Sequence, residues 1–264
     1  MSGNEAFEMT SGSGWSRGLE NMLNSGLARW FKTRTWWTNC LIWGGLIGGI
    51  TSAVAFNPQP PPYSDLLMIF TVFVGLFPAV GIVIMMQDAL VSEKREGTAA
   101  WVLSKPVTRH AFVLSKAIAN SVGVLATMVI VPCLVGYIII STAYKVSIDP
   151  LGWLGLMAVV FISDIYFLSL TLMLGSFFNN RAPVIGIPLA ILFLQQNLIN
   201  YLPFLRFVFP WNLVVPLGNT PPLVFSLIQR TSVPTEHLIL LGIILAQEIL
   251  FISLGLWRFN REEF

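Results

Sequence analysis

The chain has 264 residues, of which 55% are hydrophobic and 11% are charged, and its formal net charge is +2. Ordinary globular proteins carry about 25% charged residues, so this composition excludes a soluble globular domain, and the near-neutral charge argues against a nucleic-acid partner. The charges are gathered in short segments, which leaves several stretches of at least about 18 nearly uncharged residues, enough for a helix to cross a bilayer. We therefore expect an all-α integral membrane protein.

The N-terminal segment changes character at residue 15. Residues 1–14 are polar and rich in Ser and Gly, which predicts disorder. Residues 15–35 place apolar side chains such as Trp15 and Trp30 at helical spacing, with charged residues such as Arg29 on the other face. This pattern predicts an amphipathic helix in the membrane interface. The alternative is a cytosolic helix packed against protein.

One transmembrane domain, residues 36–264, follows this helix. Six of its stretches are long and apolar enough to span a membrane: 37–56, 66–86, 111–143, 151–178, 183–201 and 237–257. Residues 202–236 are interrupted by prolines but contain apolar stretches, so we expect short re-entrant or interfacial helices at the outer face. Cys40 and Cys133 both lie in spans and predict neither a disulfide nor a metal site.

The first span contains two overlapping pairs of small residues spaced four apart, formed by Gly44, Gly45, Gly48 and Gly49. Glycines at this spacing let two helix backbones approach closely. We therefore expect this span to pack tightly against another helix, either within the chain or in a dimer.

The basic residues set the orientation, because cytoplasmic loops carry an excess of Lys and Arg. Of the 15 Lys and Arg residues, all but Lys145, Arg206 and Arg230 fall in segments that are cytoplasmic if the N-terminus is inside. We therefore expect a multi-pass protein of the cell membrane, the cytoplasmic membrane of a prokaryote, with both termini in the cytoplasm.

The most polar block of the chain lies between the second and third spans. It reads SEKREGT at 92–98, AAWVL at 99–103, SKPVTR at 104–109 and LSK at 114–116. Ser92 is a suitable N-cap, Glu93 and Glu96 suit the first turn of a helix, and Pro106 is expected to end it. The block therefore predicts a short cytoplasmic helix over 92–104.

This block resembles the loop after the second span in the ABC-2 family of ABC transporter permeases, where an acidic segment ends in Glu-Gly-Thr and a Pro-containing turn ends in Arg. The departures are Ala99 and Ala100, where the family often has Glu, and Ser115, where Gly is usual. The resemblance implies that 92–104 is a coupling helix that sits in a groove of an ATP-binding subunit. The implied coupling residues are Glu93, Glu96, Gly97, Thr98, Trp101, Pro106 and Arg109. The alternative is an ordinary solvated loop with a run of charges.

No Gly-Lys-Ser/Thr sequence occurs in the chain, so we expect no phosphate-binding loop in it. The resemblance implies a transport subunit that is not itself an enzyme, with ATP and Mg bound by two copies of a separate ATP-binding subunit. It further implies a second copy of this chain, or a paralogous permease, since six spans are half of what an ABC transporter normally assembles. Membrane lipid and an accessory protein are the other expected partners, and the expected function is an ATP-driven exporter.

Two carboxylates fall near the middle of spans, Asp164 in the fourth and Glu248 in the sixth. Such a group must be protonated, paired or facing water, because an ionised carboxylate costs about 2.5–3.5 kcal/mol at mid-bilayer. The functional interpretation is a polar translocation path. The alternative is hydrogen bonding between helices, for instance with Gln247 or Ser163. A different function, an ATPase-independent ion-coupled carrier or channel, would also use Asp164 and Glu248.

Three consecutive amides, Gln195, Gln196 and Asn197, lie in the fifth span. They cannot share one helix face, so at least one is expected to face a partner helix or a cavity. They are candidates for the translocation path, and the alternative is that they hold helices together.

Overall fold

The computed structural model describes residues 14–217 and 220–262, and its described part is built from helices. Six of them are long and apolar enough to cross a membrane: Thr35–Ala55, Tyr63–Arg95, Arg109–Tyr144, Pro150–Phe177, Arg181–Tyr201 and Thr235–Asn260. The predicted fold class and six spans are therefore confirmed, with ends within a few residues of those expected except where the second span continues to Arg95. The disorder predicted for residues 1–14 falls almost wholly outside the described residues.

Several spans are composed of more than one helical segment. The elements that make up the spans are α2 (Thr35–Asn39), the π-helical turn η1 (Cys40–Gly44), α3 (Gly45–Ala55), α4 (Tyr63–Met86), α5 (Asp88–Arg95), α7 (Arg109–Val124), the π-helical turn η2 (Leu125–Ile130), α8 (Val131–Tyr144), α9 (Pro150–Phe177), α10 (Arg181–Tyr201) and α13 (Thr235–Asn260). The short elements outside them are α1 (Leu19–Phe31), α6 (Thr98–Leu103), the 3₁₀ turn η3 (Pro203–Phe207), α11 (Trp211–Val214) and α12 (Leu223–Ile228).

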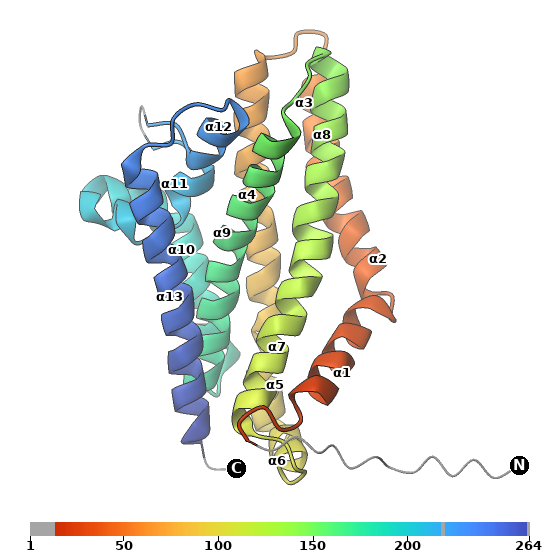
Figure 1. The fold of residues 1–264 in the computed structure, drawn as a ribbon, viewed down its shortest axis with the longest axis vertical. Coiled ribbons are helices and arrows are strands. Elements are labelled where there is room, and N and C mark those ends of the chain that lie inside the picture. Colours follow the sequence, from red (N-terminus) through yellow and green to blue (C-terminus); the bar gives the residue numbers. More distant parts are fainter. Residues whose placement is uncertain (1–13, 218–219, 263–264) are drawn as a thin grey trace, which may run out of the picture.

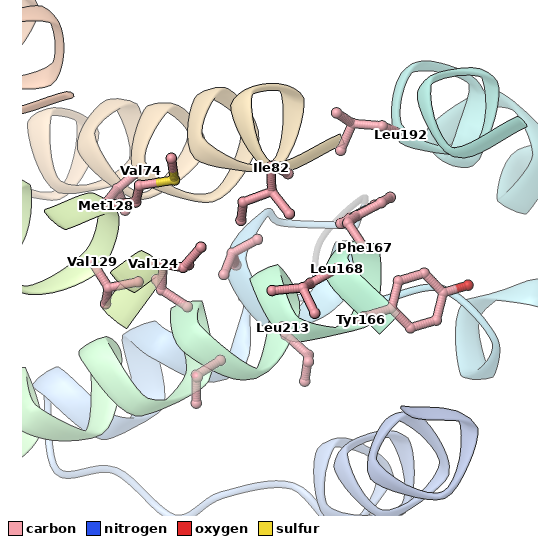
Figure 2. Close-up of a cluster of buried hydrophobic side chains, with 14 of the residues drawn as sticks. Val74, Ile82, Val124, Met128, Val129, Tyr166, Phe167, Leu168, Leu192 and Leu213 are labelled. Atoms are coloured by element: carbon pink, nitrogen blue, oxygen red, sulfur yellow. The ribbon is translucent and has the colours of Figure 1, made fainter. Parts of the chain in front are cut away.

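Helix α9 is the central helix of the bundle, with α4, α10, α12 and α13 packed around it (Figure 1). From Ser163 to Ser176 its side chains are buried on nearly every face, as expected of a helix enclosed by protein, whereas Leu151 and Leu154 near its start are exposed. Phe167 and Leu168 of α9 belong to one apolar cluster with Ile82 of α4 and Leu213 of α11 (Figure 2). This packing fixes α9 relative to both ends of the bundle.

The four glycines of the first span divide into two faces. A Cβ on Gly44 or Gly48 would lie 3.1 and 2.6 Å from the side chains of Val131 and Val135, so these two glycines admit α8. Gly45 and Gly49 have nothing within 4 Å of that position and are exposed. One small-residue pair therefore packs within the chain, and the other lies on its surface.

The amphipathic segment forms α1, which lies along α7 (Figure 1). Trp30 is only 4% exposed, and its Nε1 donates a hydrogen bond to Oδ1 of Asn120 at 3.0 Å. The structure thus shows one face of α1 packed against α7 of the same chain, which agrees both with an interfacial helix and with a cytosolic one. Trp15 and Phe31 stay exposed, and burial of this remaining apolar surface in the membrane interface stays a prediction.

The proline-rich stretch 202–236 folds into η3, α11 and α12 at the end of the bundle opposite α6 (Figure 1). All four residues of α11 are buried, and α11 packs against α9, α4 and α13. Burial of α11 covers its part of this irregular backbone with protein, whereas η3 has no buried residue. The expectation of short helices before the last span is confirmed.

An ion pair fastens α12 to the start of α9. Asp149 is the N-cap of α9, where its Oδ2 accepts a hydrogen bond from the amide of Gly152 at 2.6 Å. Arg230 donates to both carboxylate oxygens of Asp149, from Nε at 2.8 Å and from Nη2 at 2.7 Å. The Arg230 guanidinium, followed by the Gly152 amide, holds the pKa of the Asp149 carboxyl below its ordinary value.

Candidate coupling site and the polar groups of the spans

The predicted single helix over 92–104 is wrong in its boundaries, because α4 continues almost directly into α5. Ser92 is not an N-cap; it lies within α5, and its Oγ donates to the carbonyl of Asp88 at 2.5 Å. Glu93 consequently lies in the last turn of α5 instead of the first turn of a new helix. The break comes at Gly97, whose φ of 73° is the left-handed conformation that glycine adopts most easily, and α6 then begins at Thr98.

Five of the seven predicted coupling residues share one exposed surface around α6. These residues, the α6 surface, are Glu96, Gly97, Thr98, Trp101 and Pro106. Trp101 is 62% exposed, and the Nζ of Lys105 lies 3.6 Å from the centre of its ring. A large aromatic side chain left open beside a cation is a typical anchor for a protein partner.

The other two predicted coupling residues point into the protein. Glu93 forms an ion pair with Lys116 of α7. The Nη1 of Arg109 contacts three backbone carbonyls at the end of α13, those of Phe259 at 3.4 Å, Asn260 at 2.7 Å and Glu262 at 2.6 Å. The structure therefore separates Glu93 and Arg109 from the α6 surface.

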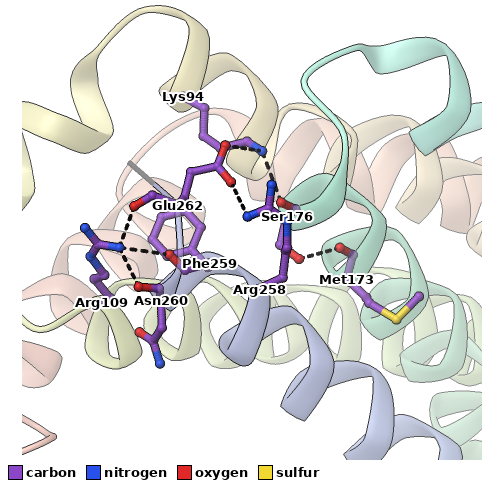
Figure 3. A network of polar contacts seen from close by, with 8 residues as sticks. All are labelled: Lys94, Arg109, Met173, Ser176, Arg258, Phe259, Asn260 and Glu262. Atoms are coloured by element: carbon purple, nitrogen blue, oxygen red, sulfur yellow. Dashed lines mark hydrogen bonds and ion pairs between the residues drawn. The ribbon is translucent and has the colours of Figure 1, made fainter. Parts of the chain in front are cut away.

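A polar network that the sequence did not reveal surrounds the end of α13 (Figure 3). Lys94 of α5 donates to the carbonyl of Ser176 at 3.2 Å and lies 3.6 Å from a carboxylate oxygen of Glu262. Arg258 pairs with the same carboxylate at 2.8 Å. The only hint in the sequence is the spacing of Arg258 and Glu262, four residues apart on one helix face; the pairing of Lys94 with a residue far along the chain has no local signal.

The turn that follows α6 is tied to the segment that precedes α1. The Thr108 amide donates to the carbonyl of Arg17 at 3.1 Å, and its Oγ1 donates to the carbonyl of Trp15 at 2.5 Å. The same Oγ1 accepts from the amide of Ala111 as the N-cap of α7. The start of α1, the turn and α7 therefore form one connected unit beside the α6 surface.

The two membrane carboxylates lie inside the protein, on helices that pack against each other. Asp164 of α9 is fully buried, and neither of its oxygens has a hydrogen-bond partner among the described residues. Glu248 is 7% exposed, lies on the buried stripe of α13, and has no partner for Oε1 within the same described ranges. The alternative that Asp164 bonds to Ser163 or another helix is thus not observed.

The three amides of the fifth span separate as their spacing requires. Gln195 is buried, and its Nε2 donates to the carbonyl of Leu192 at 3.2 Å, while Gln196 and Asn197 are exposed on the outside of α10. An amide in contact with lipid has no hydrogen-bond partner. This outer face of α10 is therefore better suited to protein or water than to hydrocarbon.

A protein-family model described as "ABC-2 family transporter protein" matches residues 44–264, which is most of the chain. No curated protein matches the chain. The matched region begins within the first span and includes the α6 surface, the network at the end of α13, and both membrane carboxylates.

Proposed function

Starting from the fact that the chain belongs to the ABC-2 transporter family, we propose that it is the membrane-spanning permease subunit of an ATP-driven exporter. It forms the translocation path, lies in the cell membrane with both termini in the cytoplasm, and is moved by a separate ATP-binding subunit. No catalytic role falls to the chain itself; ATP and Mg are bound by the partner.

The α6 surface is the observation that carries this proposal. It lies at the end of a nearly continuous helix formed by α4 and α5, because only Gln87 stands between them. A force on α6 therefore reaches the second span through only two intervening residues, Glu96 and Gly97. Trp101 and the adjacent charges supply an exposed anchor of the kind that a soluble protein groove can enclose.

The partners follow from the family and from the exposed faces of the bundle. We propose two ATP-binding subunits and a second permease, either another copy of this chain or a paralogue. Two exposed faces of the spans suit a contact with that second permease. One is the small-residue face of Gly45 and Gly49, which permits close helix packing, and the other is the polar face of α10 that bears Gln196 and Asn197. An accessory protein for the cargo remains part of the proposal.

The candidate path residues are Asp164, Glu248, Gln195, Gln196 and Asn197. Asp164 lies on α9 and Glu248 on α13, and these helices pack against each other, so a rearrangement of the two helices acts on the surroundings of both carboxylates. The chain's alternative function, an ion-coupled carrier or channel, rests on the same unpartnered Asp164. The two functions differ in whether the exposed α6 surface is needed.

Co-purification tests the proposal. The tagged full-length chain is extracted in mild detergent from its own host, and bound ATP-binding subunit and ATPase activity are measured. Trp101→Ala and Glu96→Lys should each reduce both readouts strongly, because they alter the α6 surface. Leu151→Ala, at a similarly exposed position (68%) at the start of α9, is the matched control and should retain both. Unchanged association in the Trp101 and Glu96 variants, or an ATPase that never co-purifies, would refute the proposed function.

A further inference from the structure

The end of α13 is fastened to three other elements by a compact set of polar contacts, which we call the C-terminal latch. Its members are Lys94, Arg109, the carbonyl of Ser176, Arg258, the carbonyls of Phe259 and Asn260, and Glu262 (Figure 3). These residues belong to α5, α7, the last turn of α9, and α13 with the residues just beyond it. Contacts within the latch join positions more than 80 residues apart in the chain.

Arg109 closes the latch from the side of α7. The last carbonyls of a helix have no partner within the helix, and they form the negative end of its dipole. The Arg109 guanidinium lies over two such carbonyls, those of Phe259 and Asn260, and over that of Glu262 just beyond the helix, and its positive charge is favourable beside all three. Two neighbouring contacts hold the same junction: Asn260 and the ring of His110 are 2.8 Å apart, and Phe112 stacks on Phe259 at 5.4 Å.

Lys94 closes the latch from the side of α5. Its side chain is 4% exposed and that of Glu262 is 12% exposed, so the pair is nearly removed from water. Separating such a pair leaves an uncompensated charge, which is strongly unfavourable. Lys94 stands two residues before Glu96, the first residue of the α6 surface. Displacement of that surface therefore pulls directly on α13 and on the end of α9.

We propose that the C-terminal latch transmits movement from the α6 surface to α13 and α9, and that Arg109 is a positioning residue for the end of α13. The family motif would then contain two functions. Its Glu-Gly-Thr part and Trp101 form the surface that contacts the ATP-binding subunit. Movement of that surface reaches α4 through α5. Its terminal residue Arg109 holds the end of α13, so that the same movement also reaches α13.

The consequence concerns the two membrane carboxylates. Glu248 lies on α13 and Asp164 lies on α9, so each is carried by a helix whose cytoplasmic end the latch holds. These helices are in contact at Gly255, where a Cβ would lie 3.4 Å from the Cα of Met173, an ordinary packing distance. A shift of α13 at the latch would therefore also change the contact between α13 and α9, along which Glu248 is buried.

The latch itself is tested on the chain alone, which does not depend on the proposed function. Hydrogen exchange is measured for the amides of 258–262 in the detergent-solubilised full-length protein. Arg109→Gln should speed their exchange about tenfold or more, because charged hydrogen bonds that close the helix end are lost. The exchange rate in Arg109→Lys should lie between those of Arg109→Gln and the unsubstituted protein, because a positive charge remains at position 109. Arg181→Gln removes the exposed Arg181–Asp88 pair at the same end and should leave these amides unchanged. Exchange in Arg109→Gln that equals the unsubstituted protein would overturn the latch.

Transmission rests on the proposed function and is tested in the complex with the co-purified ATP-binding subunit. Spin labels are placed at exposed positions 249 of α13 and 41 of η1, with Cys40 and Cys133 replaced by Ala. Trapping with ATP and vanadate should shift the distance between the labels in the otherwise unsubstituted chain. Arg109→Gln should abolish most of that shift while the ATPase stays bound and active, and Arg109→Lys should restore part of it. If the label distance shifts fully in Arg109→Gln, or does not shift in the parent complex, the proposal that the latch transmits movement is overturned. Absence of a bound ATPase would instead refute the proposed function, and the exchange experiment would still decide the latch.

Discussion

The contact between α1 and α7 depends on a missing side chain at Gly123. A Cβ at this position would lie 2.2 Å from two atoms of the Trp30 indole, the bulk of a rigid ring and not the tip of a flexible chain. Gly123→Ala therefore has to push the indole away by more than about 1 Å to reach ordinary contact distance. Overpacking of this kind costs about 1–3 kcal/mol. The same movement breaks the hydrogen bond from Trp30 to Asn120, which lowers the free energy of unfolding by about 1 kcal/mol more. The higher helix propensity of Ala returns about 1 kcal/mol, so we expect a net loss of about 1–3 kcal/mol.

Reversible unfolding of the full-length chain in mixed detergent measures this loss, and limited proteolysis of α1 shows where it occurs. Gly242→Ala is the matched control, because nothing lies within 4 Å of a Cβ at that glycine on the exposed side of α13. The control should be neutral or slightly stabilised. The reasoning is refuted if Gly123→Ala unfolds at the same detergent fraction as Gly242→Ala and α1 stays equally resistant to protease.

Three further predictions concern other parts of the bundle. Asp164→Leu should match or raise the melting temperature of the solubilised chain, because no hydrogen bond of this buried carboxyl is lost; a clear decrease would reveal a partner for Asp164. The Arg230 contact lowers the pKa of Asp149, so its stabilisation should be complete above the ordinary carboxyl pKa of about 4 and be lost as the pH falls through the lowered value. Melting curves between pH 7 and 3 should show this decrease, and a decrease of the same size in Asp149→Asn would contradict it. Lys116→Met should destabilise the chain by about 1–2 kcal/mol, between exposed and buried ion pairs, and adding Glu93→Gln should restore part of the loss; additive effects in the double variant would exclude the pair.

The spans could be predicted from the sequence because the bilayer imposes a simple requirement. A helix that crosses it needs about 20 apolar residues, and charges mark where it leaves. Thus the predicted 151–178 is observed as Pro150–Phe177. The interruption of 202–236 by prolines likewise predicted short helices, although their burial against α9 required the structure.

The error at Ser92 has a specific physical cause. The polar residues after Met86 suggested the start of a new helix, yet nothing between Asp88 and Arg95 breaks one, so the helix of the second span simply continues through them. The true signal was Gly97, a residue that readily adopts the left-handed conformation that ends a helix. A change from apolar to polar residues marks the membrane surface and not a helix boundary.

The role of Arg109 could not be predicted, because its partners are backbone carbonyls about 150 residues away. Backbone carbonyls leave no signal in the sequence, and the resemblance assigned Arg109 to the same contact with the ATP-binding subunit as the other six coupling residues. The same limit applies to Lys94 and Glu262, whose pairing follows from the packing of α5 and α13 against α9. Sequence patterns report periodicity along one element; they do not report which elements end beside each other.

Site-specific photocrosslinking at position 101 tests the central claim most directly. p-Benzoylphenylalanine replaces Trp101 on the α6 surface, or Tyr201 at the exposed end of α10 as the control, and cells expressing the full-length chain are irradiated. The proposed function predicts a crosslink from position 101 to an ATP-binding subunit whose yield changes when ATP is trapped with vanadate, and none from position 201. A position 101 that crosslinks no ATP-binding subunit, or no more than position 201 does, would contradict the account.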